Sequence, residues 1–328
     1  MPLEGPHPFL SFARFRFSLR VTSLMVLPPY KGAVFRGAFG NAFRRLACVA
    51  PKTECLSCDL RQRCLYVAIF EPSPPPGYRD AAKFRQAPRP YVLNPPLTTR
   101  DSFHPGEPLD FELALIGPAI EALPYFIHIF QEVGRRGLGR ERGKYELLRV
   151  DVLQHGASRP VYESATVTLS AFAPEQEPLH FPEDNRISSV TLRFLTPLRL
   201  KEKGDLVTRL IFPLLFENLV RRFRLLAAFY SGNGTRSGPE CNPISPAVGL
   251  LSAQAAEIQV SKNDLHWFDW ERYSRRQDAS MKFGGLLGSI TFSGNLAPFL
   301  PYLRLGEVMH LGQATTFGLG RYSLDIAR

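Results

Sequence analysis

The sequence lacks any long uninterrupted hydrophobic run, although 45% of its residues are hydrophobic. No stretch reaches the roughly 18 to 20 apolar residues that a membrane-spanning helix needs. Residues 1–17 contain no apolar run of signal-peptide length, because prolines and the arginines Arg14 and Arg16 interrupt them. We therefore expect no membrane association and a cytoplasmic protein, in which the five cysteines do not form structural disulfides.

Acidic residues are scarce relative to basic ones, at 30 Asp and Glu against 40 Lys and Arg. The resulting net charge of +10 and a pI near 9.6 favour a polyanionic partner such as nucleic acid over an acidic small substrate. With 328 residues, the chain is long enough for two ordinary domains, each with its own core.

An internal repeat divides the chain. Residues 123–126 (Leu-Pro-Tyr-Phe) and 137–140 (Gly-Leu-Gly-Arg) have counterparts at 300–303 (Leu-Pro-Tyr-Leu) and 318–321 (Gly-Leu-Gly-Arg). The matching order indicates duplication of a unit of about 150 residues. We therefore predict an N-terminal domain over residues 1–180 and a C-terminal domain over 186–328, joined by a segment rich in Glu and Pro.

The hydrophobic periodicity predicts the same order of elements in each half: strand, helix, strand, strand, helix, glycine-rich loop, strand. The expected helices cover residues 34–46, 119–133, 206–230 and 296–305, and the expected strands cover 12–24, 91–93, 109–116, 145–153, 165–169, 188–196, 257–273, 281–292 and 321–326. This is the βαββαβ order of a ferredoxin-like, or RRM-like, unit. The predicted fold class is α+β, with two tandem ferredoxin-like domains.

A cysteine-rich segment interrupts the N-terminal half. Its thiols, Cys48, Cys55, Cys58 and Cys64, include a C-x-x-C pair and can close a tetrahedral site around zinc or hold an iron–sulfur cluster. The alternative is a turn with reduced, partly buried thiols. We expect a structural zinc on an insertion over about residues 48–108, whose second part is rich in proline, and no cofactor for catalysis.

Two glycine-rich loops are candidate phosphate sites. The loop over residues 306–322 carries Gly312, Gly318 and Gly320, which can leave backbone N–H groups open to an anion, with Thr315, Thr316 and Arg321 as further donors. The loop in the N-terminal half is strongly basic, with Arg135, Arg136, Arg140, Arg142 and Lys144. For the first loop the alternative is a tight turn without a ligand, and for the second a solvated loop.

Two other patterns suit nucleic acid. Residues 267–282 interleave aromatic residues with Arg275, Arg276 and Lys282, an arrangement that can stack on bases and neutralise phosphates, or can form a core hairpin with a charged tip. The first strand places Arg14, Arg16 and Arg20 on one face, which either lies under RNA or is only solvated.

Four motifs resemble the RAMP superfamily of CRISPR proteins, and specifically its repeat-processing endoribonucleases. They are residues 195–201 (Leu-Thr-Pro-Leu-Arg-Leu-Lys), 270–277 (Trp-Glu-Arg-Tyr-Ser-Arg-Arg-Gln), 281–288 (Met-Lys-Phe-Gly-Gly-Leu-Leu-Gly) and 310–320 (His-x-Gly-x-x-Thr-Thr-Phe-Gly-Leu-Gly). The N-terminal half matches through Lys31-Gly32, residues 36–40, which include Arg36, and residues 137–143. The resemblance covers the C-terminal half closely and the N-terminal half through these motifs.

The resemblance implies an endoribonuclease that binds the repeat RNA of a CRISPR precursor transcript and cleaves it without a metal to give mature crRNA. In this reaction the ribose 2′-OH attacks the adjacent phosphate, which leaves a 2′,3′-cyclic phosphate and a 5′-OH. Such chemistry needs a base, an acid and a cation. Many family members place a catalytic histidine in or just before the first helix, whereas residues 30–46 contain none.

The catalytic candidates are therefore spread along the chain. Tyr30, Lys31 and Arg36 stand where the family places its catalytic histidine and offer a proton relay and charge. His310 precedes the C-terminal glycine loop, with a capping or RNA-positioning role as its alternative, and His128 lies in an apolar helical context that favours packing. The rival function is a RAMP subunit that holds crRNA in a CRISPR effector complex without cutting it, and a third is a nucleic-acid scaffold unrelated to CRISPR.

Overall fold

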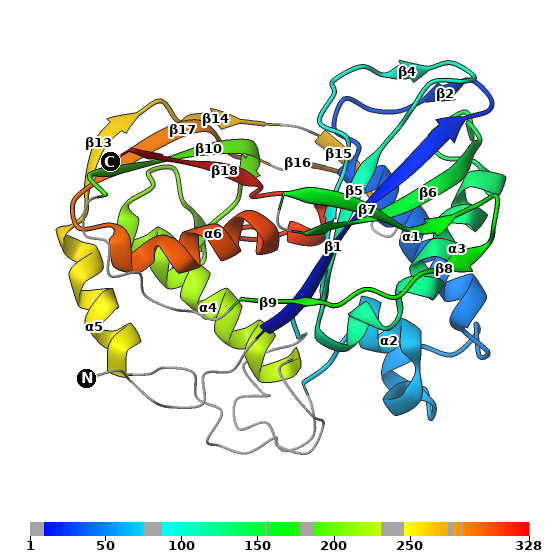
Figure 1. The fold of residues 1–328 in the computed structure, drawn as a ribbon, viewed down its shortest axis with the longest axis horizontal. Helices are drawn as coiled ribbons and strands as arrows, with labels where there is room; N and C mark the ends of the chain where they lie inside the picture. The colour runs from blue at the N-terminus through cyan, green and yellow to red at the C-terminus, as the bar shows by residue number, and fades with distance from the viewer. Residues whose placement is uncertain are drawn as a thin grey trace. The chain divides into compact units, whose positions relative to one another are not determined.

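The computed structural model describes residues 10–74, 87–154, 156–177, 187–230, 246–269, 271–274, 279–282 and 284–327 (Figure 1). They form two compact units. One contains Leu10–Gln176 and the residues from Leu226 to the end of helix α4, and the other contains Glu177–Leu225 and the chain beyond residue 242. The sequence predicted a single boundary at residues 180–186. In the structure the end of α4 also belongs to the N-terminal unit, where the Tyr230 hydroxyl donates to the Pro88 carbonyl (2.6 Å).

The N-terminal unit is an antiparallel sheet covered by two helices. Its elements are β1 (Leu10–Val21), α1 (Gly32–Ala47), β3 (Tyr91–Asn94), β5 (Phe111–Ile116), α3 (Leu123–Arg136), β6 (Tyr145–Gln154), β7 (Ala157–Glu163) and β8 (Thr168–Leu169). The strands lie in the order β3-β5-β1-β6-β7-β8, with β1 antiparallel to both β5 and β6. The short strand β9 (Glu175–Glu177) also pairs with β1.

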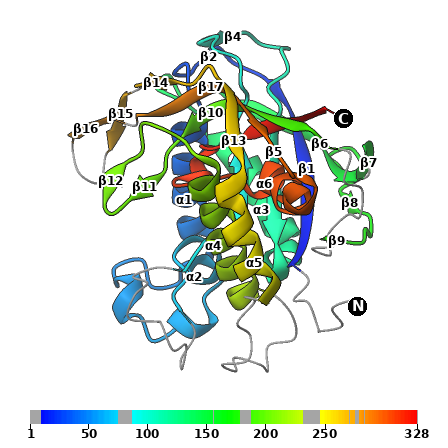
Figure 2. The same ribbon diagram turned by 90° about the vertical axis from the view of Figure 1, so that its left-hand side faces the viewer.

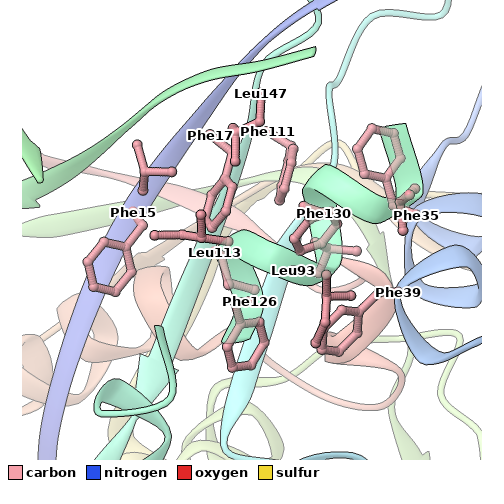
Figure 3. Packing of buried hydrophobic residues seen from close by; sticks show 14 of the residues in the cluster. Phe15, Phe17, Phe35, Phe39, Leu93, Phe111, Leu113, Phe126, Phe130 and Leu147 are labelled. Atoms are coloured by element: carbon pink, nitrogen blue, oxygen red, sulfur yellow. The ribbon is translucent and has the colours of Figure 1, made fainter. Parts of the chain in front are cut away.

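A cluster of phenylalanine rings forms the core of this unit (Figure 3). Alternation along β1 turns Phe15 and Phe17 inward, and Phe17 stacks on Phe111 of β5 with ring centroids 4.8 Å apart. Phe39 of α1 stacks on Phe130 of α3 at 5.5 Å, which joins the two helices above the sheet. Large aromatic side chains of this kind supply much of the apolar area that a domain buries.

On the opposite face of the sheet, the arginines of β1 form ion pairs with carboxylates of the same unit. Arg16 pairs with Glu112 of β5 (3.1 Å), and Arg20 pairs with Glu146 of β6 (2.9 Å). Arg14 pairs with Glu175 at 3.7 Å. Because each arginine of β1 faces a carboxylate, this face is a poor phosphate-binding surface, and the solvated alternative describes it better.

The C-terminal unit repeats this arrangement. Its main elements are β10 (Ser189–Leu198), α4 (Phe212–Tyr230), α5 (Pro246–Gln254), β13 (Gln259–Asn263), β14 (His266–Phe268), β17 (Gly285–Ser293), α6 (Leu300–Met309) and β18 (Tyr322–Ala327). The strand order is β13-β17-β10-β18, and Figures 1 and 2 show α4 and α6 on one face of this sheet. Numbered along the chain, the four main strands of each unit lie in the order second, third, first, fourth.

Several elements differ from the sequence-based expectation. The long helix begins at Phe212 rather than near residue 206, because Lys201–Glu202 (β11) and Asp205–Leu206 (β12) form a hairpin. The expected strand over residues 257–273 is broken into β13, β14 and β15 (Glu271–Ser274), the last paired with β16 (Ala279–Lys282). Helix α5 and the short helix α2 (Leu65–Phe70) were not expected. Among the described residues, no helix combines the length and apolar character needed to cross a bilayer.

Candidate nucleic-acid interface

The start of α1 is held by a buried lysine. Lys31 is fully buried, and its ammonium donates to the carbonyl oxygens of Pro28 (3.4 Å), Pro29 (3.2 Å) and Thr98 (2.6 Å). Burial lowers the pKa of Lys31 to about 8, with Asp101 opposing and Arg100 adding to the shift. These three acceptors use all three ammonium N–H groups, so Lys31 has none left for a phosphate in this conformation.

The basic glycine turn lies against the segment that leads to this helix. Leu138 pairs with Gly143 across the turn. A Cβ atom at Gly139 would overlap the carbonyl oxygen of Val26, and one at Gly143 would overlap Met25, so both glycines permit close packing on strand β2 (Met25–Val26). Tyr30, half-buried, follows β2 by four residues. The structure therefore brings the basic turn and the start of α1 together in one unit.

The charges of this turn point to solvent. Arg140, Arg142 and Lys144 are exposed, and within the described chain none of them forms an ion pair with a carboxylate. Arg135 and Arg136, at the end of α3, are also exposed but both pair with Glu132. Part of the predicted basic cluster is thus neutralised, and the unpaired charge is concentrated at Arg140, Arg142 and Lys144.

An exposed histidine that the sequence analysis did not single out lies beside this surface. Strand β4 (Ser102–Phe103) pairs with β2, and the Leu27 N–H donates to Asp101 (2.7 Å). His104 follows β4 directly, is exposed, and donates its backbone N–H to the Glu107 carboxylate (2.7 Å). Residues 21–27 therefore lie between the His104 segment and Lys144, whose carbonyl accepts from Thr22. No local motif marks His104, because its position depends on pairing between β2 and β4.

The backbone N–H groups of the C-terminal glycine loop are used in hydrogen bonds within the protein and do not form an open anion-binding site. The N–H groups of Leu311, Gln313 and Gly320 donate to the carbonyls of Gly320, Arg199 and Pro197 at 2.8–3.0 Å. The Thr196 hydroxyl donates to Gly318 (2.7 Å) and accepts from the Arg321 N–H (2.9 Å). The expected row of open N–H groups is therefore wrong for Gly320 and for Gly318, whose N–H donates to the Thr315 carbonyl (2.9 Å).

The exposed part of this loop is small. Thr315 and Thr316 are buried, whereas Gly312 and Arg321 are half-buried and Gln313 is exposed. The RNA-binding roles assigned from sequence to Gly312, Thr315, Thr316, Gly318, Gly320 and Arg321 stay predictions. Of these residues, Gly312 and Arg321 have the accessibility that direct contact needs.

His310 is buried beneath the same loop. It lies at the C-terminal end of α6 with a φ of 58°, a backbone conformation that is uncommon for residues other than glycine. Nδ1 lies 3.1 Å from the Leu319 carbonyl oxygen, and Nε2 has no partner among the described residues. Burial, then the charge of Arg321, lowers the pKa of His310 to about 3, although the bond to Leu319 opposes this shift. An inaccessible, neutral imidazole is a poor acid or base at neutral pH.

The remaining sequence-based candidates are dispersed. His128 is exposed on α3, so the expectation that it packs in the core is wrong. Arg36 is half-buried with its guanidinium 4.6 Å from the centre of the Phe70 ring. Arg275 and Arg276 lie outside the described residues, and of Lys282 only the backbone, in β16, is described.

Exposed aromatic residues mark one strand of the C-terminal unit. Trp267 and Phe268 of β14 are 39% and 41% exposed, and β14 pairs with β17 at the side of the sheet. The Trp267 indole donates to Asp269 (3.0 Å), and a Cβ atom at Gly284 would overlap the indole ring. Two accessible aromatic rings on a strand can stack with unpaired bases.

The four cysteines of the insertion are free thiols and are all half-buried. Burial raises the pKa of the Cys55 thiol, with Glu71, Cys48 and Cys64 adding to the shift and Arg44 opposing it. Among the described residues, no group of three or more His, Cys, Asp and Glu side chains has the arrangement of a metal site. Zinc at these cysteines stays a prediction.

Two models of known protein families match this chain, one in each half. A family model described as an N-terminal domain matches residues 10–176, and the model for the CRISPR-associated endoribonuclease Cas6 matches residues 192–322. Residues 192–322 therefore form a domain of the Cas6 family. This match confirms the resemblance found in the sequence and supports a role in processing or binding CRISPR RNA.

Known relatives extend over the whole chain. An uncharacterized protein of Archaeoglobus fulgidus is 27% identical over 320 residues, which cover 94% of this chain and 99% of the relative. A Cas6 product complex has a TM-score of 0.54 at 16% identity, covering 96% of this chain and all of the other. A partial Cas6-RT-Cas1–Cas2 complex has a TM-score of 0.57 at 14% identity, and this chain spans 46% of that longer protein. These structures share a mixed α+β fold with antiparallel sheets.

Proposed function

We propose that this chain binds the repeat RNA of a CRISPR precursor transcript and cleaves it by attack of a ribose 2′-OH on the adjacent phosphate. The products are a 2′,3′-cyclic phosphate and a 5′-OH, and the step needs no metal. One observation carries the proposal: residues 21–31 join the segment that leads to His104, the backbone of the basic turn and the start of α1 within one unit. The shared strand order further supports two ferredoxin-like domains derived from a duplication.

The residues of this surface suit the reaction. The attack requires removal of the 2′-OH proton, protonation of the departing 5′ oxygen and stabilisation of the extra negative charge on phosphorus. Arg140, Arg142 and Lys144 supply the positive charge. The exposed imidazole of His104 is the group that we assign to proton transfer, with the hydroxyl of Tyr30 as the second proton-transfer group.

Lys31 contributes by positioning. Its three bonds to backbone carbonyls hold the Pro28-Pro29 turn and the Thr98 segment against the start of α1. The same lysine therefore helps the β2–β4 pairing to hold Tyr30 near the strand that leads to His104. A loss of this clamp alters geometry rather than removing a phosphate contact.

The C-terminal unit contributes a second contact. Trp267 and Phe268 offer exposed rings for bases of a single-stranded part of the repeat, and sequence places Arg275, Arg276 and Lys282 in the hairpin that follows. Stacking is tolerant of sequence, so we assign this strand to affinity and the N-terminal surface to cleavage.

A subunit that holds crRNA in an effector complex without cutting it is the alternative, because residues 30–46 lack a histidine and His310 is buried. The test uses labelled RNA with the repeat of the protein's own locus, and scrambled RNA of the same composition, under single-turnover conditions in excess EDTA. A parallel thermal unfolding scan in EDTA shows whether the fold persists. One cut in the repeat RNA alone supports the nuclease, whereas tight binding by folded protein without a cut supports the alternative.

Two exposed histidines provide a matched comparison for the catalytic assignment. His104→Asn should lower the single-turnover rate by about 10²-fold or more, as loss of a general acid or base does, while the dissociation constant changes little. His128→Asn, equally exposed but on α3, should leave both quantities unchanged. An unchanged rate for His104→Asn removes it from the reaction and leaves Tyr30 as the residue to test.

A further inference from the structure

The cysteine-rich segment has an unusual pattern of buried and exposed residues. From Cys48 to Cys64, the residues that are not exposed are the four cysteines, Ala50 and Arg61. The larger apolar side chains face solvent instead: Val49 is 80% exposed, Leu56 78% and Leu60 50%. The hydrophobic effect alone would bury leucine and valine as readily as cysteine, so apolar character does not explain which residues of this segment are half-buried.

The backbone of this segment holds the turns that carry the thiols close together. Cys55 begins a 3-10 turn that ends at Ser57, and Cys58 follows it directly. A second 3-10 turn, Arg61–Arg63, lies between Cys58 and Cys64, with the Arg61 N–H donating to the Cys58 carbonyl (3.0 Å). The Arg61 guanidinium donates to the Cys55 carbonyl (2.8 Å), which draws the two turns together.

The segment also joins two helices of the N-terminal unit. Cys48 is the residue at which α1 ends, and Cys64 is the residue from which α2 starts. Phe70 of α2 lies so close to Gly40 of α1 that a Cβ atom there would overlap its ring. Figure 2 shows α2 and the turns that precede it. A link between Cys48 and Cys64 therefore fixes the end of α1 against α2.

We propose that Cys48, Cys55, Cys58 and Cys64 bind one zinc ion as four thiolates, which fastens α1 to α2. The sulfur atoms do not already have the arrangement of a bound ion, so the proposal rests on the partial burial of all four cysteines and on the hydrogen bond that joins their two turns, and binding draws the thiolates together. A short segment that buries no large apolar side chain has little other source of stability, and a tetrathiolate zinc supplies it. Four protein ligands leave no open position for catalysis, so the ion is structural.

The proposal is independent of RNA cleavage, because its readouts are metal content and local stability. The full chain, purified without a metal-affinity step and dialysed, is analysed for zinc, iron and acid-labile sulfide. We expect about one zinc per chain, and replacement by Co²⁺ should give the thiolate-to-cobalt absorption of a tetrahedral sulfur site. Iron with sulfide, disulfides among these cysteines, or a metal-free protein with four titratable thiols each overturns the proposal.

Substitution of single cysteines tests which of them bind the zinc ion. Cys58→Ser is a conservative removal, because Cys58, unlike Cys55 and Cys64, does not pack on the hydrophobic core and, unlike Cys48, does not end a helix. We expect it to lower zinc affinity by at least tenfold and to speed amide hydrogen exchange in α2 more than in β1. Cys241→Ser, the fifth cysteine, should retain one zinc. Full zinc in Cys58→Ser, or loss in Cys241→Ser, overturns the ligand assignment.

Discussion

The Lys31 ammonium lies 2.6 Å from the carbonyl oxygen of Thr98, which holds the start of α1 to the segment that continues into β4. Tyr30 directly precedes Lys31, and the segment from Thr98 continues to His104, so this contact and the β2–β4 pairing together join the two segments. The Phe103 ring, 5.6 Å from the ammonium, covers it from the side of β4. The clamp has consequences for stability that can be measured without RNA.

The pH dependence of stability tests this clamp. Burial lowers the pKa of Lys31 from 10.5 to about 8, so between these values the unfolded chain binds a proton that the folded chain has released. The free energy of unfolding should therefore rise with pH over this window, by up to about 3 kcal/mol from this group, and the gain is lost as pH falls through 8. Urea unfolding of wild type and Lys31→Met should differ most in this window. Equal pH dependence in the two proteins would show that Lys31 is not buried as described.

The basic turn is expected to bind phosphates. Replacement of Arg140, Arg142 and Lys144 by glutamine should weaken RNA binding and reduce the slope of log affinity against log salt by about 0.7 for each single-strand phosphate that the variant no longer neutralises. Glutamine keeps a side chain at Arg142, so the positive φ of 49° at this position is equally demanding in both proteins. Arg16→Gln, whose arginine already pairs with Glu112, is the matched control and should leave the salt slope unchanged.

The exposed aromatic strand should contribute affinity but not rate. Trp267→Ala and Phe268→Ala are each expected to weaken binding of single-stranded repeat RNA by about 1–3 kcal/mol, the usual value for a stacked base. Tyr125→Ala, on the exposed face of α3, is the control because its ring is 56% exposed. Equal losses for the three variants, or a lower cleavage rate at saturating protein, would contradict this division of roles.

His310 is expected to affect acid stability rather than chemistry. Burial lowers the pKa of His310 from 6.5 to about 3. Between these two pH values the imidazole is protonated in the unfolded chain but not in the folded chain. Stability from this group is therefore present above pH 6.5 and is lost as pH falls towards 3. His310→Asn, which tolerates the positive φ, should flatten this part of the stability curve. A large fall in single-turnover rate with unchanged acid stability would restore the catalytic assignment.

Periodicity was sufficient for the main elements. The alternation of Phe15, Arg16 and Phe17 predicted β1, and the apolar spacing around Phe126 and Phe130 predicted α3, because half-buried elements show their period directly. Short elements were missed: α2 has six residues, too few to display a period. The late start of α4 followed from the hairpin β11–β12, whose pairing is not visible in local propensity.

The candidate site was less predictable than the fold. His310 belongs to a motif of the family, yet whether an imidazole faces solvent depends on its interaction with Leu319 and on the packing of α6. His128 was misjudged because its apolar neighbours in sequence point to the other side of the helix. His104 became a candidate only through the β2–β4 ladder, which joins residues far apart in the chain.

The most direct test of the central claim substitutes the attacking group of the RNA itself. Repeat RNA with a single 2′-deoxynucleotide on the 5′ side of the mapped cleavage point should bind this chain with unchanged affinity and remain uncut in EDTA. The unmodified RNA should yield a 2′,3′-cyclic phosphate and a 5′-OH. Cleavage of the deoxy-substituted RNA at the same phosphate, or products that carry a 3′-OH and a 5′-phosphate, would contradict the proposed mechanism.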